Sequence, residues 1–157
     1  MNKTEYEIGV ISDTHGRLHP GVMNIFKDVD HIIHAGDVCG SDIIEELGKL
    51  AQVTAVKGNM DSGKLSLKLN ATESVKIGPA LIYVLHIPGM LDIIPHERGF
   101  NVVITGHTHI PLVKTEDGVL YLNPGSATCP KHQNSPTAAM LHINTGGGMH
   151  AEIIPLE

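Results

Sequence analysis

The chain has 157 residues and a formal net charge of −6; 41% of the residues are hydrophobic and 18% are charged. This length, with no linker and no low-complexity stretch, predicts a single domain over residues 1–157. The acidic balance and the lack of a lysine and arginine cluster argue against general nucleic-acid binding, which needs cations that neutralise phosphates. No segment has the roughly 18 uninterrupted apolar residues of a membrane span, so we expect no membrane association.

Cysteine usage bears on the cellular compartment. Cys39 and Cys129 lie far apart in the sequence, without the spacing of a metal or redox motif. The first residues contain no apolar signal segment. We therefore expect a cytoplasmic protein with reduced cysteines. The 11 histidines are the unusual feature of the composition, and the rest of the interpretation depends on their positions.

The first strand is expected over residues 6–11, a β-rich run that stops at the polar segment 12–16. Asp13 and His15, two residues apart in that segment, can chelate one metal ion together. In the alternative interpretation, Asp13 only caps a helix expected over residues 20–27.

A second strand over residues 31–35 ends at a glycine and Asp37, which places a carboxylate at the same kind of strand end. The helix expected next, over residues 41–50, starts with a capping pattern in which Ser41 is the cap. Asp37 is therefore free for another role.

Not every polar residue near these strands is expected to be a ligand. His31 and His34 lie within the second strand, where we expect buried, hydrogen-bonded histidines. A third strand over residues 53–57 is followed by a glycine and Asn59, and asparagine is an uncommon ligand. Asn59 can instead be a turn residue in the left-handed conformation.

The middle of the chain gives one weak and one strong strand signal. Residues 65–78 predict an irregular strand or a hairpin, whereas residues 80–85 predict a buried strand that ends at His86. A helix is expected over residues 91–97.

The strand expected over residues 102–105 is rich in β-branched residues and ends in a Gly-His-Thr-His segment. If this loop stays extended, the side chains of His107 and His109 lie on one side of the backbone and can face one site. Neutral imidazole is the commonest protein ligand of transition metals. In the alternative interpretation, both are solvated histidines of a surface loop.

In the last third of the chain the sequence pattern changes to one that predicts antiparallel β structure. Two hairpins are expected, one from strands over residues 112–115 and 119–122 and one from strands over residues 138–143 and 150–154. Between the hairpins, residues 123–126 (Asn-Pro-Gly-Ser) predict a turn whose backbone amides could face the same sheet edge. The chain is thus expected to join a βαβ-type first half to antiparallel β structure.

Five consecutive strand-like runs end in nitrogen or oxygen donors. These donors are Asp13, His15, Asp37, Asn59, His86, His107 and His109. Open α/β sheets bind ligands where the carboxyl ends of their strands meet, so the seven side chains are expected to share one pocket. Seven donors are too many for one ion and suit two ions that share a carboxylate, for which Asp37 is the natural choice.

The order of these motifs, DTH, GD, GN, H and GHTH, resembles that of the calcineurin-like metallophosphoesterase superfamily. The GNxD and NPGS segments make the chain most similar to its small bacterial and archaeal phosphodiesterase branch. The resemblance spans residues 12–126 and implies an α/β fold, a four-layer sandwich of two mixed β-sheets flanked by helices. It also implies a homodimer or a homotetramer, which small members often form.

The same resemblance implies two divalent metal ions per chain, often Mn²⁺ and sometimes Fe, Zn or Ni. One ion would be held by Asp13, His15, Asp37 and His109, and the other by Asp37, Asn59, His86 and His107. Such a pair of ions supplies a bridging hydroxide as nucleophile and neutralises the phosphoryl oxygens during in-line attack. We therefore expect a metal-dependent phosphodiesterase that acts on a small phosphate ester. The expected catalytic residues are Asp37, Asn59, His86 and His107.

The chain departs from the superfamily pattern at two positions. Met60 stands where many members have a histidine assigned as general acid, and Asp61, which is retained, cannot donate a proton when ionised. His132 and metal-bound water are the alternative proton donors. Ile87 stands where relatives commonly have glycine, and we expect it to narrow the pocket beside the metals. Cys39 is not expected to be a ligand, because the donor set is complete without it.

Two other functions are compatible with these motifs. The chain also resembles a retromer subunit that has the same fold, has lost metal ligands and serves as a protein-binding scaffold. All seven donor positions are filled here, which favours the enzyme. Metal sensing or storage by the histidines would instead place the ligands on a surface, away from strand ends.

Overall fold

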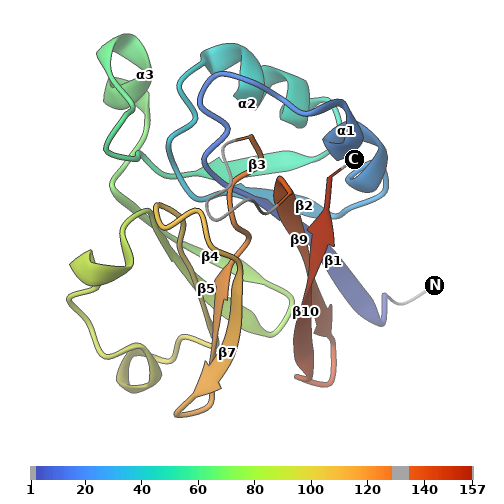
Figure 1. Cartoon of the computed structure of the whole chain (residues 1–157). Coiled ribbons are helices and arrows are strands. Elements are labelled where there is room, and N and C mark those ends of the chain that lie inside the picture. The colour runs from blue at the N-terminus through green and yellow to red at the C-terminus, as the bar shows by residue number, and fades with distance from the viewer. Residues whose placement is uncertain (1–2, 129–134, 157) are drawn as a thin grey trace.

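The computed structural model describes residues 3–128 and 135–156, and within them ten strands form two five-stranded sheets (Figure 1). The order in the first sheet is β10 (Met149–Pro155), β9 (Thr137–Asn144), β1 (Glu5–Ile11), β2 (His31–His34) and β3 (Gln52–Ala55). The order in the second is β4 (Thr72–Ile77), β5 (Ala80–Leu85), β6 (Val102–Ile104), β8 (Val119–Asn123) and β7 (Leu112–Glu116).

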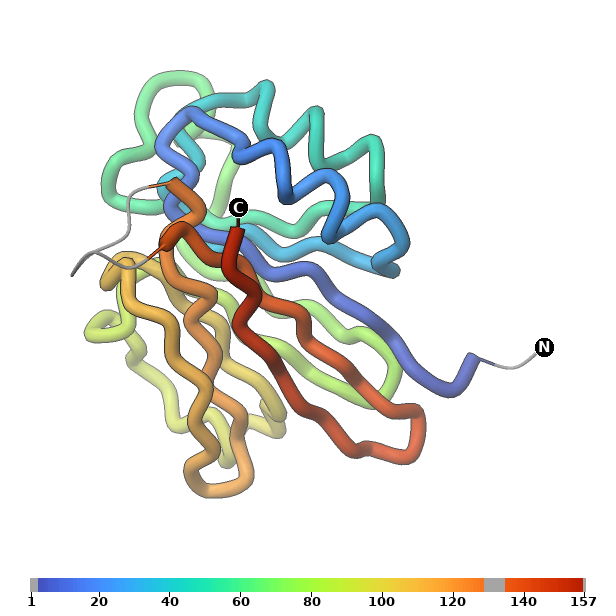
Figure 2. Tube along the Cα trace, turned by 45° about the vertical axis from the view of Figure 1, so that its right-hand side comes forward, coloured from blue at the N-terminus to red at the C-terminus, as the bar shows by residue number. Residues whose placement is uncertain are grey.

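Both sheets are mixed, and each contains three parallel strands. In the first sheet β1, β2 and β3 are parallel, while β9 and β10 are antiparallel to their neighbours. In the second sheet β5, β6 and β8 are parallel, with β4 and β7 antiparallel at the edges. The final hairpin, red in Figure 2, runs alongside β1, which is blue.

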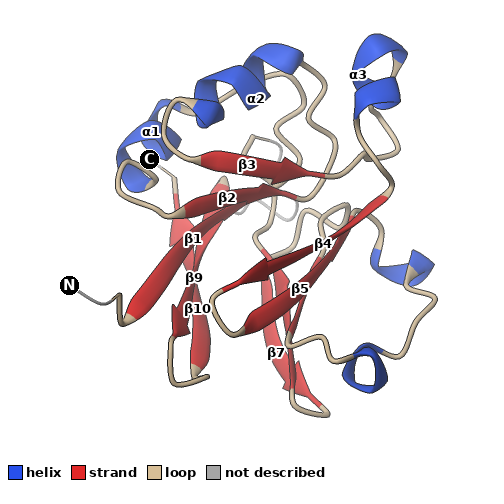
Figure 3. Cartoon of the chain, turned by 180° about the vertical axis from the view of Figure 1, so that it is seen from behind, coloured by secondary structure: helices blue, strands red, loops and turns tan. Residues whose placement is uncertain are grey.

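The helical segments are short. They are α1 (Pro20–Ile25), α2 (Ser41–Gly48), α3 (Gly63–Lys68) and the 3₁₀ segments η1 (Pro88–Met90) and η2 (Pro95–Arg98). α1 and α2 lie over the outer face of the first sheet (Figure 3).

Three apolar layers hold these elements together. The largest lies between the sheets, where Ile33 and Leu141 of the first sheet pack in one cluster with Val84 and Ile104 of the second. A second layer joins α1 and α2 to the first sheet. On the outer face of the second sheet, Leu91 packs in a small cluster with residues of β5, β6 and β8. This arrangement confirms the predicted four-layer sandwich, with a thin fourth layer.

The predicted strands are confirmed with shifts of one or two residues, and both hairpins of the last third are present. The segment over residues 65–78 differs from the expectation, because it begins inside the helix α3 and only then forms β4, which pairs with β5. A six-residue helix is too short to show helical periodicity in the sequence. The helix expected over residues 91–97 is also wrong, since Pro95 starts a separate 3₁₀ segment.

Both capping assignments differ from the expectation. Gly40 is the N-cap of α2, and Ser41 is already the first residue of the helix, so Ser41 does not cap it. His19 caps α1, where its Nδ1 accepts a hydrogen bond from the amide of Gly21. The alternative in which Asp13 caps this helix is therefore wrong. No helix in the described ranges is long and apolar enough to cross a membrane.

Phe26→Ala is expected to lower the free energy of unfolding by about 3–5 kcal/mol, the usual cost of removing a buried phenylalanine. Phe26 is fully buried between α1 and the first sheet, and its ring lies against Gly9 of β1, where a Cβ atom would come within 2.8 Å. Urea denaturation measures the change. Leu67→Ala removes a side chain that is 86% exposed and should change stability by less than about 0.5 kcal/mol. Equal losses in the two variants would contradict this packing.

Candidate metal centre

The seven side chains singled out from the sequence lie in loops at one edge of the molecule. Asp13 and His15 follow β1, Asp37 follows β2, and Asn59 follows β3 in the first sheet. His86 directly follows β5, and His107 and His109 follow β6 in the second sheet. The structure brings all seven together, because the carboxyl ends of the parallel strands of both sheets meet at this edge.

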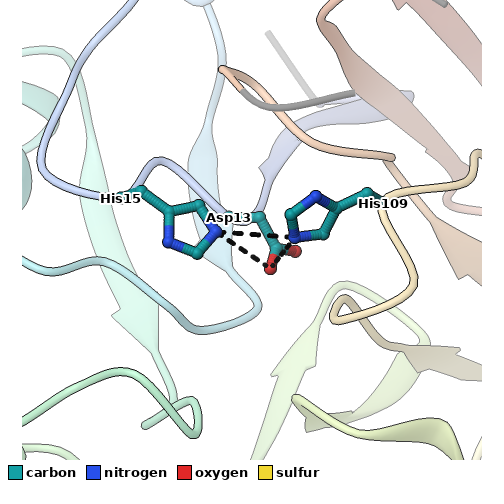
Figure 4. A group of neighbouring side chains, drawn as sticks. All are labelled: Asp13, His15 and His109. Carbon is teal, nitrogen blue, oxygen red and sulfur yellow. Dashed lines mark hydrogen bonds and ion pairs between the residues drawn. The ribbon is translucent and has the colours of Figure 1, made fainter. Parts of the chain in front are cut away.

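One end of the group consists of Asp13, His15 and His109 (Figure 4). The Nε2 of His109 lies 3.1 Å from Oδ1 of Asp13, and the Nε2 of His15 lies 3.7 Å from the same oxygen. The two Nε2 atoms are 3.5 Å apart. Three donors from two loops that lie far apart in the sequence thus converge on one point.

The other end contains Asn59, His86 and His107. The Oδ1 of Asn59 lies 3.0 Å from Nε2 of His86 and 3.1 Å from Nδ1 of His107. The rings of the two histidines meet edge to face with centroids 5.3 Å apart. The alternative in which Asn59 is a left-handed turn residue is wrong, because its φ is not positive.

Two buried carboxylates connect the two ends. Oδ2 of Asp37 lies 3.2 Å from Nε2 of His86 and 4.0 Å from Nε2 of His15. Oδ1 of Asp13 lies 3.8 Å from Nε2 of His86, so Asp13 reaches both ends as well. The bridging position predicted for Asp37 agrees with these distances, and Asp13 shares it.

The polar atoms of this centre suit a cation. Oδ1 of Asp13 is buried and accepts no hydrogen bond within the described residues. Nδ1 of His86 lies 2.7 Å from the carbonyl oxygen of Ala35, which can only accept, so this nitrogen carries the proton in the neutral ring. The Nε2 of His86 then carries no proton, yet it faces oxygens of Asp37 and Asn59. These atoms are all hydrogen-bond acceptors, and no hydrogen lies between them. A bound metal ion resolves this opposition, and a backbone partner for the other ring nitrogen is usual for metal-binding histidines.

Without a metal, a proton can take the place of the cation. Burial lowers the pKa of His86, but the hydrogen bonds with Asp37 and the carbonyl of Ala35, together with the charges of Asp13 and Asp37, outweigh burial and raise the pKa above its ordinary value. Burial raises the pKa of Asp37, but the hydrogen bonds from His86 and the amide of Met60, together with the charges of His86 and His15, outweigh burial and lower the pKa. These two shifts favour a protonated His86 beside an ionised Asp37.

The backbone of the centre is strained at five of the seven positions. Residues with positive φ are Asp13 (55°), His15 (47°), Asp37 (55°), His107 (69°) and His109 (61°). The expectation of an extended His-Thr-His loop is therefore wrong. The loop turns sharply because the amide of Thr108 bonds the carbonyl of Gly106 at 2.8 Å. As a result His107 and His109 reach opposite ends of the centre.

Several supporting residues escaped the sequence interpretation. Ser12 Oγ and the amide of His107 donate to Oδ2 of Asp13 at 2.6 and 3.0 Å, which fixes that carboxylate. The carboxylate of Asp61 accepts from the amides of Cys39 and Gly58, both at 2.8 Å, and so holds the loops that follow β2 and β3. The GNxD pattern already contained Asp61, but the pattern alone does not reveal its partners.

The Asn-Pro-Gly-Ser turn acts through side chains, contrary to the expectation that its amides face the centre. Asn123 Nδ2 donates to the carbonyl of Gly106 at 2.9 Å, and Ser126 Oγ donates to the carbonyl of Asp13 at 2.9 Å. The amide of Gly125 is occupied by the side chain of Asn123. This turn therefore ties together two loops that carry candidate ligands.

The residues that depart from the superfamily pattern lie near the centre. Met60 is 59% exposed, and its amide donates to Asp37 Oδ1 at 2.8 Å. Burial raises the pKa of the Cys39 thiol to about 11, and this thiol donates to the carbonyl of Met60, so it is not poised as a thiolate ligand. His132 and Cys129 lie outside the described residues.

His31 and His34 are buried and hydrogen bonded, which confirms the expectation. Nε2 of His31 lies 2.8 Å from Oγ1 of Thr54. Nδ1 of His34 accepts from the amide of Gly36, so Nε2–H donates to Oγ1 of Thr14 at 3.0 Å. Burial lowers the pKa of both, and that of His34 falls from 6.5 to about 3.

The buried His34 predicts a loss of stability in acid. Between pH 6.5 and about 3 the unfolded chain binds a proton at this residue and the folded chain does not. The free energy of unfolding should therefore fall as the pH falls, by up to about 1.4 kcal/mol per pH unit from this group. Urea denaturation of the metal-free protein at pH 4–6.5 should give a shallower slope for His34→Gln. An unchanged slope would contradict the assignment of a neutral His34.

The fold and this centre define a class of protein: a two-sheet α/β domain with aspartate, histidine and asparagine donors at the carboxyl ends of its parallel strands. The family model of the calcineurin-like phosphoesterase superfamily domain matches residues 6–146. The chain belongs to this superfamily, and its relatives include probable metallophosphoesterases and phosphodiesterases.

Individual relatives agree with this membership. A probable metallophosphoesterase of Methanocaldococcus jannaschii is 38% identical over 159 residues, which cover 96% of this chain and 81% of the relative. The solved structure of an archaeal phosphodiesterase matches with a TM-score of 0.76 and 28% identity, covering 94% of this chain and 99% of that one. Vps29 of Entamoeba histolytica complexed with Zn²⁺ matches with a TM-score of 0.68 and 26% identity, covering 96% and 99%.

Proposed function

We propose that the protein is a phosphodiesterase with two divalent metal ions, Mn²⁺ in the first instance and Fe, Zn or Ni as alternatives. The observation that carries this proposal is the set of seven nitrogen and oxygen donors at one edge, where the buried Asp13 Oδ1 accepts no hydrogen bond from the residues that the structure describes. Asp13, His15, Asp37 and His109 would hold one ion, and Asp37, Asn59, His86 and His107 the other. Oxygen and imidazole ligands without thiolate suit such ions.

When bound, two such ions neutralise the phosphoryl oxygens and lower the pKa of the attacking water. The protein residues fix the geometry. Asp37 and Asp13 lie between the two ends, while Ser12 and Ala35 orient the ligands Asp13 and His86 through hydrogen bonds. No side-chain nucleophile is required. With Met60 at the position of the usual general acid, we propose that the best substrates have leaving groups that need little protonation.

The length of the chain favours a single domain, the cysteine pattern favours the cytoplasm, and the family resemblance favours small phosphate esters as substrates. A homodimer or homotetramer belongs to the proposal on the ground of family resemblance. The scaffold alternative draws support from the match to Vps29, and it predicts no hydrolysis at any metal load. A sensing or storage protein would bind metal but would also leave phosphodiesters intact.

One titration separates these functions. Protein stripped by a chelator is titrated with Mn²⁺ while calorimetry counts bound ions and absorbance follows hydrolysis of bis(p-nitrophenyl) phosphate. We expect activity to vanish on chelation and to return as about two ions bind per chain. Binding without hydrolysis would favour sensing or a scaffold, and failure to bind two ions would overturn the dinuclear proposal.

A further inference from the structure

A pocket of about 330 Å³ lies directly beside the candidate metal centre. Two of the proposed ligands, Asn59 and His86, form part of its wall, so the pocket opens onto the centre itself. The connection from β3 through α3 to β4 joins the two sheets and supplies one side of the wall (Figure 3). Its volume is at the lower end of the range for small-molecule pockets, roughly 300–1,000 Å³, which suits a compact group and not a polymer.

The wall of this pocket is mainly apolar. Tyr83 and Leu85 contribute from β5, and Ile87 and Met90 contribute from the segment that follows it. Ile87 is the residue that replaces the usual glycine, and here it adds an apolar surface next to His86. An aromatic ring and branched or thioether side chains are the surfaces on which a flat organic group packs.

Two charged side chains of opposite sign also line the pocket, Lys57 and Asp92. Within the described residues, neither forms an ion pair or a side-chain hydrogen bond, so both can serve a ligand. Lys57 and the proposed metal ligand Asn59 both line this pocket, so the lysine belongs to the part of the wall that continues from the centre. A donor and an acceptor whose charges cancel suit an uncharged group that offers both acceptors and donors.

We infer that this pocket binds the organic group of the substrate and that this group is compact, uncharged and partly aromatic, of the size and kind of a nucleoside. Lys57 and Asp92 are then specificity-determining residues, which bind the polar edge of the group while Tyr83 and Met90 contact its face. This inference rests on the proposed function, because the metal centre must hold the phosphoryl group for the pocket to receive the rest of the ester.

The binding of two phosphate monoesters tests the inference, and because only binding is measured, the result does not depend on which ester bond the enzyme cleaves. Thymidine 5′-monophosphate and methyl phosphate share the phosphate that the metals bind, and they differ only in the organic group. Calorimetric titration of the Mn²⁺-loaded protein measures both dissociation constants. We expect thymidine 5′-monophosphate to bind at least about tenfold more tightly than methyl phosphate, since the pocket adds buried contacts.

Substitutions in the wall test whether this pocket causes the tighter binding of thymidine 5′-monophosphate. Ala71→Phe places a ring in the pocket from an exposed wall position and should abolish the preference while methyl phosphate binds as before. Lys57→Met keeps the length of the side chain, removes its cation and should weaken only the binding of the nucleotide, several-fold. Val113→Phe adds the same ring on β7, away from this pocket, and serves as the matched control. Thermal unfolding of each variant confirms that it is folded.

The outcomes separate this inference from the proposed function. Equal binding of the two esters by the unmodified protein, or an undiminished preference in folded Ala71→Phe and Lys57→Met, would overturn the pocket inference even if bis(p-nitrophenyl) phosphate is hydrolysed. Absence of hydrolysis together with failure of methyl phosphate to bind would overturn the proposed function instead.

Discussion

Asp13→Asn is expected to reduce Mn²⁺-dependent hydrolysis of bis(p-nitrophenyl) phosphate by more than about 100-fold. Loss of a residue that only supports a metal ligand typically costs about 10–100-fold, and Asp13 is proposed as a ligand itself. Its Oδ1 is fully buried within 3.1–3.8 Å of nitrogens of His109, His15 and His86. An amide at this position either turns a donor toward the ions or offers an uncharged oxygen. Steady-state kinetics and metal counting by calorimetry measure the effect.

Asp28→Asn is the matched control, since Asp28 is exposed and lies outside the centre. This variant should keep the activity and the metal stoichiometry of the unmodified protein. If Asp13→Asn also bound two ions and hydrolysed the diester normally, Asp13 would not be a ligand, and the assignment of its end of the centre would have to be abandoned.

Gly58→Ala is expected to impair the centre without altering any proposed ligand. A Cβ atom on Gly58 would meet Oδ1 of Asp37 at 2.2 Å and its backbone nitrogen at 2.3 Å, so Asp37 and its loop must move. Overpacking of this kind costs about 1–3 kcal/mol of stability. A displacement of about 1 Å at a catalytic position can cost about 100-fold in rate. Chemical denaturation and the diesterase assay measure the two effects.

Gly48→Ala is the control for this substitution. Gly48 ends α2, and no atom outside its local helix lies within 4 Å of the Cβ position. Alanine there should leave activity unchanged and add up to about 0.5–1 kcal/mol of stability, because alanine loses less backbone entropy in a helix. Normal activity and metal binding in Gly58→Ala would contradict the close packing of that loop on Asp37.

The sequence predicted the strands and the candidate ligands well because both depend on local patterns. β6 is a β-branched run and β2 has two isoleucines at its centre; a glycine follows shortly after each strand, and the topology places the donors after them at one edge. The short helix α3 was missed, since six residues carry no visible period. The Ser41 cap was wrong because a capping pattern does not specify which residue begins the helix.

The supporting residues of the centre could not be predicted for a different reason. Asp61 bonds the amide of Cys39 across 22 positions, and Ser126 bonds the carbonyl of Asp13 across 113 positions. The first pair depends on how neighbouring strands of one sheet align and the second on how the two sheets pack, and no spacing in the sequence encodes either. The sharp turn at Thr108 was likewise not predicted, because histidine adopts the left-handed conformation too rarely for the pattern to show that His107 and His109 do so.

The five left-handed backbones at the centre have an evolutionary consequence. A residue other than glycine in that conformation costs on the order of 1 kcal/mol, and such residues are common at functional sites, where the surrounding structure holds them in place. A mutant library selected only for heat resistance should therefore accumulate glycine at His15, His107 and His109, and the hardiest survivors should be inactive. Sequencing the selected variants would show at which positions the natural protein is less stable than it could be.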